Sequence, residues 1–355
     1  MAVVLQFPYV NETTEVKKRS FAFLTAVVTT AVHSIGRDEE DEAAERVFAV
    51  ICAVLGLMIV CISCLRKRAG RRIKMDIKNN LHQQVKEKVI FVLGSTATGK
   101  SKLAIYLANK FQGEVINSDK IQVHKGLDIV TNKVTDEEMG GVPHHLIGVI
   151  DPEAEFTIAD FCEKTLHAVT SILDRGNLPI IVGGSNRYIE SLVDNETLRF
   201  RNKYECCFLW VHVNLPILKK YIYERVDQMV QSGLVDEVRD FFSLDGDYSK
   251  GIRRSIGVPE LDAYFRAEAA GCENKEMLEE LFKEGIDMMK SNTYDLACRQ
   301  FEKINRLRLE KGWKIHLLDA TEVFHKRGFQ REQEWRLRVA DPSMDIVCNF
   351  LYGDR

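Results

Sequence analysis

The chain has 355 residues, of which 45% are hydrophobic and 28% charged; these values are typical of a packed globular protein and exclude wholesale disorder. Lysine and arginine number 49 against 52 aspartates and glutamates, so the net charge of -3 argues against a strongly cationic nucleic-acid binder. The nine cysteines are an odd number scattered along the chain, which argues against a disulfide framework and favours a reducing compartment.

The first 85 residues differ in pattern from the remainder. An acidic cluster at 38–45 precedes an uncharged apolar run at 47–65, and six basic residues follow within 66–74. Nineteen helical residues would span about 28 Å, roughly one hydrocarbon core, and the basic flank would face the cytosol. This N-terminal apolar extension therefore predicts a membrane anchor or a targeting segment, and a start at Met75 also fits the pattern.

From residue 86 onward, short apolar runs alternate with helical patterns. The predicted strands are 89–93, 114–118, 178–182, 206–213 and 313–318. The predicted helices are 102–110, 156–175, a segment from Pro216 to about Gly233, 275–311 and 328–339. This alternation predicts an α/β fold over 86–355, with a parallel sheet covered by helices on both faces and a helical C-terminal part.

The strongest local motif matches G-x-x-x-x-G-K-[ST], the pattern of a phosphate-binding loop: Gly94, Ser95, Thr96, Ala97, Thr98, Gly99, Lys100 and Ser101. It follows a predicted buried strand and opens a predicted helix, as the motif requires. Glycines let backbone amides surround a phosphate, the helix N-terminus adds a positive dipole, Lys100 supplies a cation and the Ser101 hydroxyl can bind Mg²⁺. The motif predicts a P-loop NTPase-like fold with a diphosphate or triphosphate site, a property shared by kinases, GTPases and ATPases.

The sequence offers no convincing carboxylate to hold a metal at the end of a second buried strand, where ATPases and GTPases usually place one. Asp151 follows a short apolar run, but the neighbouring Pro152 favours a loop at this position. The predicted strand 178–182 ends in two glycines without an acid. These observations argue against an ATPase or a GTPase.

An ordered series of short motifs follows the phosphate-binding loop, at residues 116–129, 131–133, 142–146, 183–189, 251–257, 292–293 and 299–300. Together with the loop, this series closely resembles the dimethylallyl (isopentenyl) transferases of adenine. That family includes tRNA-modifying enzymes and the plant adenylate isopentenyltransferases that begin cytokinin synthesis. The resemblance covers about residues 86–355 and does not extend to the first 85 residues.

The resemblance implies a prenyl transfer from dimethylallyl diphosphate to the exocyclic N6 amine of adenine, with release of diphosphate. Backbone amides, Lys100 and a Mg²⁺ ion on Ser101 would neutralise the leaving group. By its match to the family motif, Asp119 is the carboxylate that accepts the amine proton, which typically contributes about 10²–10⁴-fold. Arg299 resembles a family arginine near the diphosphate, and the fork of an arginine suits that anion.

Six further side chains are candidates for substrate contacts, each with an alternative as a turn, loop or solvated helix residue: Ser118, Thr131, Lys133, Ser185, Lys220 and Lys290. The two serines would hydrogen-bond adenine or phosphates. The last two lysines would hold the extra phosphates of ATP or ADP.

The choice between a free nucleotide and tRNA depends on what is missing from the family pattern. The tRNA enzymes carry a long insertion that grips the anticodon arm, but only about a dozen residues separate 188–192 from the strand that begins at 206. Tyr294 and Cys298 stand where those enzymes favour basic residues. We therefore expect a monomer that uses ATP or ADP, with AMP less favoured and no nucleic-acid partner. The alternatives are a tRNA dimethylallyltransferase, a non-catalytic membrane-tethered nucleotide-binding protein and a small-molecule kinase.

Two features predict different locations for the protein. The resemblance implies a plastid, and less often the cytosol or the mitochondrion. The apolar run at 47–65 indicates the alternative of a membrane anchor with the catalytic domain in the cytosol.

Overall fold

The computed structural model describes residues 86–353, so the predicted membrane or targeting segment at 47–65 lies outside the described residues. Over these residues the strands form one parallel sheet with the order β3-β2-β4-β1-β5-β6. The strands are β1 (Glu87–Leu93), β2 (Gly113–Asn117), β3 (His144–His145), β4 (Leu178–Val182), β5 (Tyr204–His212) and β6 (Ile315–Asp319). The predicted α/β fold with a parallel sheet is confirmed.

Strand β1 lies near the middle of the sheet, between β4 and β5, and its register pairs Ile90 with Ile180 and with Cys207. All side chains from Val89 to Leu93 are fully buried. Ile90 belongs to the apolar cluster on one face of the sheet, whereas Val89 and Phe91 belong to the cluster on the other face. A strand covered on both faces has no polar side, which explains why its sequence is a continuous apolar run.

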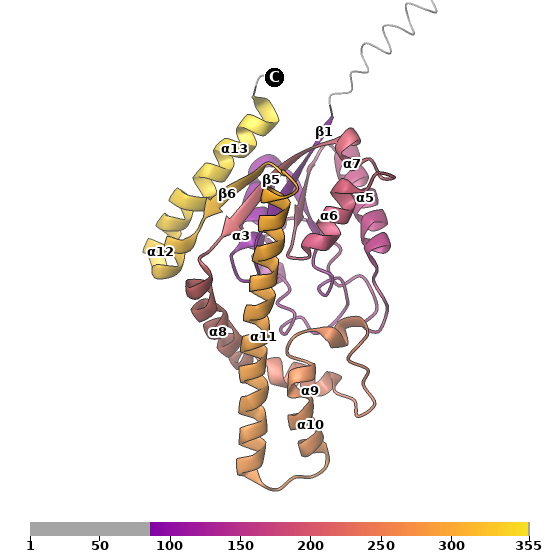
Figure 1. Ribbon diagram of the computed structural model, residues 1–355, viewed down its shortest axis with the longest axis vertical. Coiled ribbons are helices and arrows are strands. Elements are labelled where there is room, and N and C mark those ends of the chain that lie inside the picture. Colours follow the sequence, from indigo (N-terminus) through magenta and orange to yellow (C-terminus); the bar gives the residue numbers. More distant parts are fainter. Residues whose placement is uncertain (1–85, 354–355) are drawn as a thin grey trace, which may run out of the picture. The chain divides into compact units, whose positions relative to one another are not determined.

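Helices cover both faces of the sheet (Figure 1). On one face pack α3 (Lys100–Phe111), α8 (Leu215–Gln231) and α13 (Asp341–Tyr352). On the other face pack α5 (Ile158–Asp174), α6 (Asn186–Asp194) and the C-terminal half of α11 (Lys275–Leu309). The remaining helices are α4 (Asp136–Met139), α7 (Phe200–Lys203), α9 (Leu234–Phe241), α10 (Asp262–Ala269) and α12 (Gly328–Trp335).

Local sequence signals set several helix ends. Thr157 and Asp160 form a capping box before α5, in which each side chain accepts a hydrogen bond from the backbone N–H of the other. Pro216 lies in the first turn of α8, where its missing N–H costs no helical hydrogen bond. Beyond the end of α8, Gly233 adopts a φ of 97°, a conformation that glycine tolerates best.

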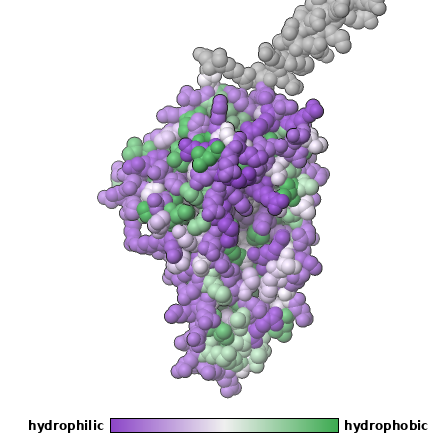
Figure 2. All heavy atoms as spheres, in the orientation of Figure 1, coloured by the Kyte–Doolittle hydropathy of each residue, from purple (hydrophilic) through white to green (hydrophobic). Residues whose placement is uncertain are grey.

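Helix α11 has 35 residues and is therefore about 52 Å long, so it extends well beyond the sheet (Figure 1). Its C-terminal half packs on the sheet through Ala297, Ile304 and Leu307. Its N-terminal half packs with α9 and α10 in a third apolar cluster, which we call the distal helical cluster. Figure 2 shows apolar surface at the end of the molecule that this cluster forms. On α11, Met277 and Met288 are 48% and 47% exposed.

The C-terminal part is more helical than its charged sequence predicts. The expected helix at 328–339 is α12 followed by a π-helical turn, Arg336–Ala340, and then by α13. Val339, Ala340 and Val347 are fully buried, so apolar packing continues the helix past its predicted end. None of the helices within residues 86–353 is long and apolar enough to cross a membrane.

Candidate active site

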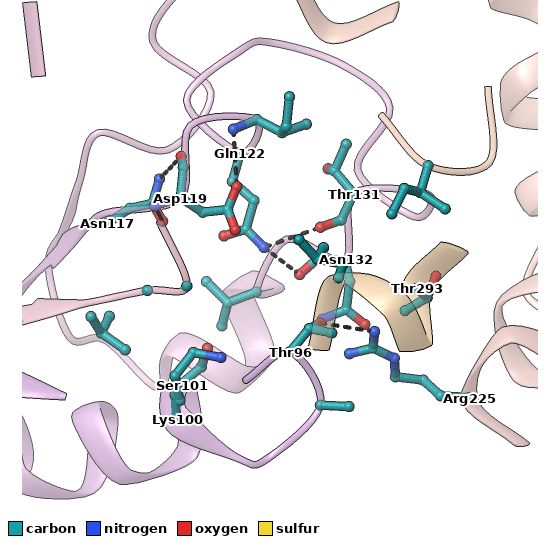
Figure 3. A pocket seen from close by; sticks show the side chains of 18 of the residues that line it. Thr96, Lys100, Ser101, Asn117, Asp119, Gln122, Thr131, Asn132, Arg225 and Thr293 are labelled. Carbon is teal, nitrogen blue, oxygen red and sulfur yellow. Dashed lines mark hydrogen bonds between the residues drawn. The ribbon is translucent and has the colours of Figure 1, made fainter. Parts of the chain in front are cut away.

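A cavity of about 600 Å³ lies at the carboxyl edge of the sheet (Figure 3). Its loop wall consists of residues that follow β1, β2 and β4, represented by Thr96, Asp119 and Gly183. Its helix wall consists of side chains from α8 and α11, including Arg225 and Arg299. Ligands of open α/β sheets bind at this edge, where the strand ends leave a crevice.

The phosphate-binding loop between β1 and α3 has the backbone that its glycines predict. Gly99 adopts a φ of 89°, and a Cβ on Gly94 would lie 2.6 Å from the carbonyl oxygen of Val211. Ser95 donates a hydrogen bond to the carbonyl of Ala297 at 2.8 Å, and Thr98 donates one to the carbonyl of Ser95 at 3.0 Å. Five residues of the loop line the cavity: Thr96, Ala97, Gly99, Lys100 and Ser101. Gly94, Ser95 and Thr98 instead hold the shape of the loop.

Lys100 places a desolvated ammonium group in the cavity. Its Nζ donates a hydrogen bond to the carbonyl of Ser95 at 2.6 Å. Burial lowers the pKa of Lys100 to about 8, while the charge of Asp119 opposes this shift and that of Arg225 adds to it. An anionic ligand would supply the counter-charge that this ammonium group lacks.

Asp119 is fixed by hydrogen bonds around it. The Asn117 side chain accepts a hydrogen bond from the N–H of Asp119 at 2.9 Å and donates one to its carbonyl at 3.0 Å. Oδ1 of Asp119 accepts a hydrogen bond from the N–H of Ile121 at 2.9 Å. The other carboxylate oxygen makes no hydrogen bond within the described residues, and Asp119 lines the cavity (Figure 3). Asp119 therefore presents a free oxygen that can accept a proton from a bound group.

Arg225 is a buried cation that the sequence analysis missed. It lies within α8, and its Nη2 donates a hydrogen bond to the Thr96 hydroxyl at 3.1 Å (Figure 3). Its Nε is buried without a hydrogen-bond partner, and burial lowers the pKa of Arg225. A buried donor without a partner is costly, so this guanidinium is suited to an anion that enters the cavity. No motif marks this residue, because it lies in the middle of a helix.

Gln300 joins the helix wall to the loop wall. Its Oε1 accepts a hydrogen bond from the backbone N–H of Thr96 at 2.6 Å, and its Nε2 donates one to the carbonyl of Gly184 at 3.1 Å. A Cβ on Gly184 would clash with this amide group, which explains why glycine stands there. In the sequence, Gln300 belongs to the short motif at 299–300, in which only Arg299 was predicted to have a role.

The segment at 127–133 forms a compact loop beside the cavity, which we call the 127–133 loop. The carboxylate of Glu237, on α9, accepts hydrogen bonds from the N–H groups of Ile129 at 2.9 Å and Val130 at 2.8 Å. The Gln122 side chain donates hydrogen bonds to the carbonyls of Thr131 and Asn132, each at 3.0 Å (Figure 3). Glu237 thereby connects the distal helical cluster to the wall of the cavity.

The structure brings only one of the two residues predicted from this loop to the cavity. Thr131 lines the cavity, and its hydroxyl donates a hydrogen bond to the carbonyl of Leu127 at 2.7 Å. Lys133 is buried within the loop, where its Nζ donates hydrogen bonds to the carbonyl of Gly126 at 2.5 Å and to Asp128 at 2.7 Å. Lys133 thus stabilises the loop from inside.

Four other predicted residues lie outside the lining of the cavity: Ser118, Ser185, Lys220 and Lys290. The Ser118 hydroxyl is buried without a hydrogen-bond partner, and that of Ser185 accepts a hydrogen bond from the N–H of Lys120 at 3.1 Å. Lys220 has a side chain that is 79% exposed, and Lys290 forms an ion pair with Asp227 at 2.6 Å. The geometry gives no support to their assignment as substrate contacts, which stays a prediction.

The charges around the cavity are strongly unequal. Seven cationic side chains line it: Lys100, Lys102, Lys120, Arg225, Arg254, Arg299 and Arg331. Only two carboxylates do so, Asp119 and Glu138. Burial lowers the pKa of Lys120, as does the charge of Arg254, so these cations crowd one another. This excess of positive charge suits a ligand with several phosphate groups.

A metal ion would find few ligands in this cavity. Within the described residues, no group of three or more His, Cys, Asp and Glu side chains could hold one. The Ser101 hydroxyl, which the sequence predicted as the Mg²⁺ ligand, lines the cavity, and the Asp119 carboxylate is a second oxygen donor there. This donor set fits Mg²⁺ when oxygens of a bound diphosphate complete its coordination.

Comparison with known proteins identifies relatives of the chain. The family described as IPP transferase matches residues 122–200 and 194–306. Adenylate isopentenyltransferase 3, chloroplastic, from Arabidopsis thaliana is 53% identical over 269 residues, which cover 75% of this chain and 80% of that protein. Adenylate isopentenyltransferase 7, mitochondrial, from the same plant is 48% identical over 293 residues, or 81% and 86% of the two chains.

A solved structure shares the fold. It is a eukaryotic dimethylallyltransferase acting on tRNA, with a TM-score of 0.63 and 25% sequence identity. The match covers 76% of this chain and 80% of that one.

Proposed function

The chain belongs to the IPP transferase family, and on that premise we propose that it is an adenylate isopentenyltransferase. It transfers a dimethylallyl group from dimethylallyl diphosphate to the N6 amine of ATP or ADP and releases diphosphate, the first step of cytokinin synthesis. The observation that supports this most directly is that the phosphate-binding loop and a fixed carboxylate, Asp119, line one cavity rich in cations.

The loop wall and the helix wall would share the binding of the donor. Residues of the loop, including Lys100, and Arg225 of the helix wall line the space where a diphosphate would lie. When the allylic carbon–oxygen bond breaks, its electron pair stays on the diphosphate, and these cations stabilise the added charge. A Mg²⁺ ion held by Ser101 and the diphosphate would add further neutralisation when bound.

Asp119 would act on the acceptor. As N6 of adenine forms its bond to the allylic carbon, it must lose a proton, because a neutral aromatic amine would otherwise become a cation. The free oxygen of Asp119 accepts that proton. Arg299 and Arg254, at the rim of the cavity, are suited to phosphates of either substrate.

A free nucleotide is a better acceptor for this chain than tRNA. Only α7, a helix of four residues, lies between α6 and β5, which leaves no room there for an insertion that grips an anticodon arm. The relatives at about half identity are named adenylate isopentenyltransferases, whereas the structure described as acting on tRNA shares 25% identity. Transfer to tRNA remains the second candidate.

The printed names of these relatives also bear on location. One is described as chloroplastic and one as mitochondrial, so we infer an organelle, and a plastid in the first instance. Fractionation of the full chain beside a chain that starts at Met75 tests this inference. Recovery of both chains in the same cytosolic fraction would contradict it, and membrane recovery of the full chain alone would favour an anchor at 47–65.

The decisive experiment offers ATP, ADP, AMP and tRNA together with dimethylallyl diphosphate and identifies the products by mass spectrometry. We expect N6-prenylated ATP and ADP as the main products and stoichiometric diphosphate. Prenylated tRNA as the main product would instead establish the second candidate. Transfer of phosphate from ATP without prenylation would reject both.

A further inference from the structure

Helix α12, in the C-terminal part of the chain, contributes a side chain to the cavity, although it lies beyond residue 306, where the family match ends. Arg331 of α12 lines the cavity together with residues of the phosphate-binding loop. Lys102, in the first turn of α3, forms an ion pair with Glu332 at 2.6 Å, and its Nζ lies 4.0 Å from the ring centre of Trp335. These contacts hold α12 beside the start of α3, and so beside the loop that α3 follows.

Arg331 rests on aromatic rings. Its guanidinium carbon lies 5.0 Å from the ring centre of Tyr221 and 5.3 Å from that of Phe324. The two rings pack edge to face, with centres 4.8 Å apart and planes at 85°. Within residues 86–353, Arg331 forms no ion pair with a carboxylate. A guanidinium that stacks on rings keeps its N–H donors free for an anion.

Helix α8 aligns this arginine with the buried one. Tyr221 and Arg225 are four residues apart on α8 and therefore share one of its faces, at a separation of about 6 Å along the axis. Arg225 reaches Thr96 of the phosphate-binding loop, and Tyr221 supports Arg331 one turn away. Two guanidinium groups thus line the cavity next to the same face of α8.

We propose that Arg331 binds a phosphate oxygen of the donor's diphosphate, as a cation supplied by helix α12. Its neighbours Lys102, Tyr221 and Arg225 lie on the side of the phosphate-binding loop. Lys120 and Arg254 belong to other segments of the lining: Lys120 directly follows Asp119 in the chain after β2, and Arg254 lies in the 3₁₀ turn Gly251–Arg254. The donor's diphosphate is therefore the anion assigned to Arg331, and the phosphates of the acceptor are the alternative. This inference rests on the proposed function.

The test measures equilibrium binding of inorganic diphosphate and steady-state kinetics in Arg331→Ala and Arg331→Gln, the second of which keeps most of the side-chain stem over the rings. We expect about tenfold weaker diphosphate binding and an equal rise in KM for the donor, because a charge-assisted hydrogen bond is lost. The KM for ATP should change little, and Arg331→Lys should recover part of the diphosphate affinity. Arg336→Ala is the matched control, because its side chain is 72% exposed and does not line the cavity.

The outcomes separate this inference from the proposed function. Unchanged diphosphate binding in both variants, beside a wild-type chain that binds it, overturns the inference alone. A rise in KM for ATP without one for the donor also overturns it. If the wild-type chain binds diphosphate and the variants weaken that binding, but no adenylate is prenylated, the inference stands and the proposed function fails.

Discussion

The two walls of the cavity are built in different ways. The loop wall is contiguous in sequence, because Gly94 to Ser101 fold back on their own backbone between β1 and α3. The helix wall is assembled from distant segments, with Arg225 on α8 and Gln300 on α11. The walls meet at Thr96, whose N–H donates to Gln300 at 2.6 Å and whose hydroxyl accepts from Arg225 at 3.1 Å.

The phosphate-binding motif therefore supplies only one half of the anion site, and the helix wall supplies the other. The loop supplies a shaped backbone and one ammonium group, Lys100, whose pKa burial lowers to about 8. The helix wall supplies guanidinium groups, which as a class are more basic than an ammonium group. If both halves bind the diphosphate, changes to either wall should weaken donor binding, and only the loop side should affect proton transfer.

The largest effect should come from Asp119, which belongs to the loop wall. Asp119→Asn should lower kcat by about 10²–10⁴-fold, because it removes the proton acceptor. Binding of inorganic diphosphate, measured by calorimetry, should stay within about twofold. Asp151→Asn is the control, since Asp151 is an exposed carboxylate paired with Lys125 at 2.8 Å outside the cavity. Wild-type turnover in Asp119→Asn would remove the residue from the reaction.

The next effect tests the helix wall. Arg225→Met should weaken diphosphate binding by about 10- to 100-fold, because it deletes a buried guanidinium beside Thr96. The free energy of unfolding without ligand should fall by less than about 1 kcal/mol or even rise, since the change also removes a buried Nε without a partner. Titration and chemical denaturation of the same samples measure both. Unaltered diphosphate affinity would mean that the loop wall binds the donor alone.

The pH dependence of donor binding should distinguish the ammonium of the loop wall from the guanidinium groups. The pKa of Lys100 in the free protein is about 8, so the ammonium is charged below that pH and neutral above it. Diphosphate affinity should therefore fall by up to about tenfold per pH unit above 8, as binding then requires uptake of a proton. Lys100→Arg should flatten this profile, because an arginine stays charged. An identical slope in the wild type and in this variant would contradict the assignment.

The lowered pKa of Lys100 affects stability in the opposite direction: the free energy of unfolding should rise with pH where diphosphate affinity falls. In the folded protein without ligand, the pKa of Lys100 lies below its usual value of 10.5. Below about pH 8 the lysine is charged in both the folded and the unfolded chain, and its burial there lowers the free energy of unfolding. This penalty should be relieved as pH rises from about 8 towards 10.5.

The smallest effect concerns the 127–133 loop, which the distal helical cluster holds in place. Glu237→Gln keeps the size of the side chain but removes the negative charge of the carboxylate, which accepts hydrogen bonds from the N–H groups of Ile129 and Val130. We expect the KM values of the substrates to be three- to tenfold higher and the free energy of unfolding to be about 1–2 kcal/mol lower. Asp236→Asn is the control, as Asp236 is an exposed neighbour paired with Arg239. Equal effects of the two substitutions would show that the loop does not depend on Glu237.

Several parts of the fold could be predicted because they depend on local chemistry. The apolar run in β1, the capping box of Thr157 and Asp160, and the glycines of the phosphate-binding loop each act over a few residues. Asp119 lies two residues after the end of β2, and parallel strands end at one edge of the sheet, so its position beside the loop followed from topology.

The predicted residues that the structure places outside the lining of the cavity are those whose side-chain direction the sequence pattern did not specify. Lys220 lies between Leu218 and Ile222 on α8, which are buried, so the helical period turns it towards solvent. Lys290 follows Met289 on α11 and pairs with Asp227 of α8. The buried residues of α8 recur at helical spacing, and this periodicity places Arg225 beside the buried stripe and Lys220 away from it.

The sequence by itself determined the strand–loop–helix unit that forms the phosphate-binding loop, the parallel sheet and the carboxylate at its edge, because neighbouring residues and strand direction specify these features. Only the tertiary structure decided that Arg225, Gln300 and Arg331 gather around that loop. Each belongs to a different helix, α8, α11 or α12, and the rotation and height of these helices depend on how their apolar faces pack on the sheet. That packing is a property of the whole core, which no local pattern specifies.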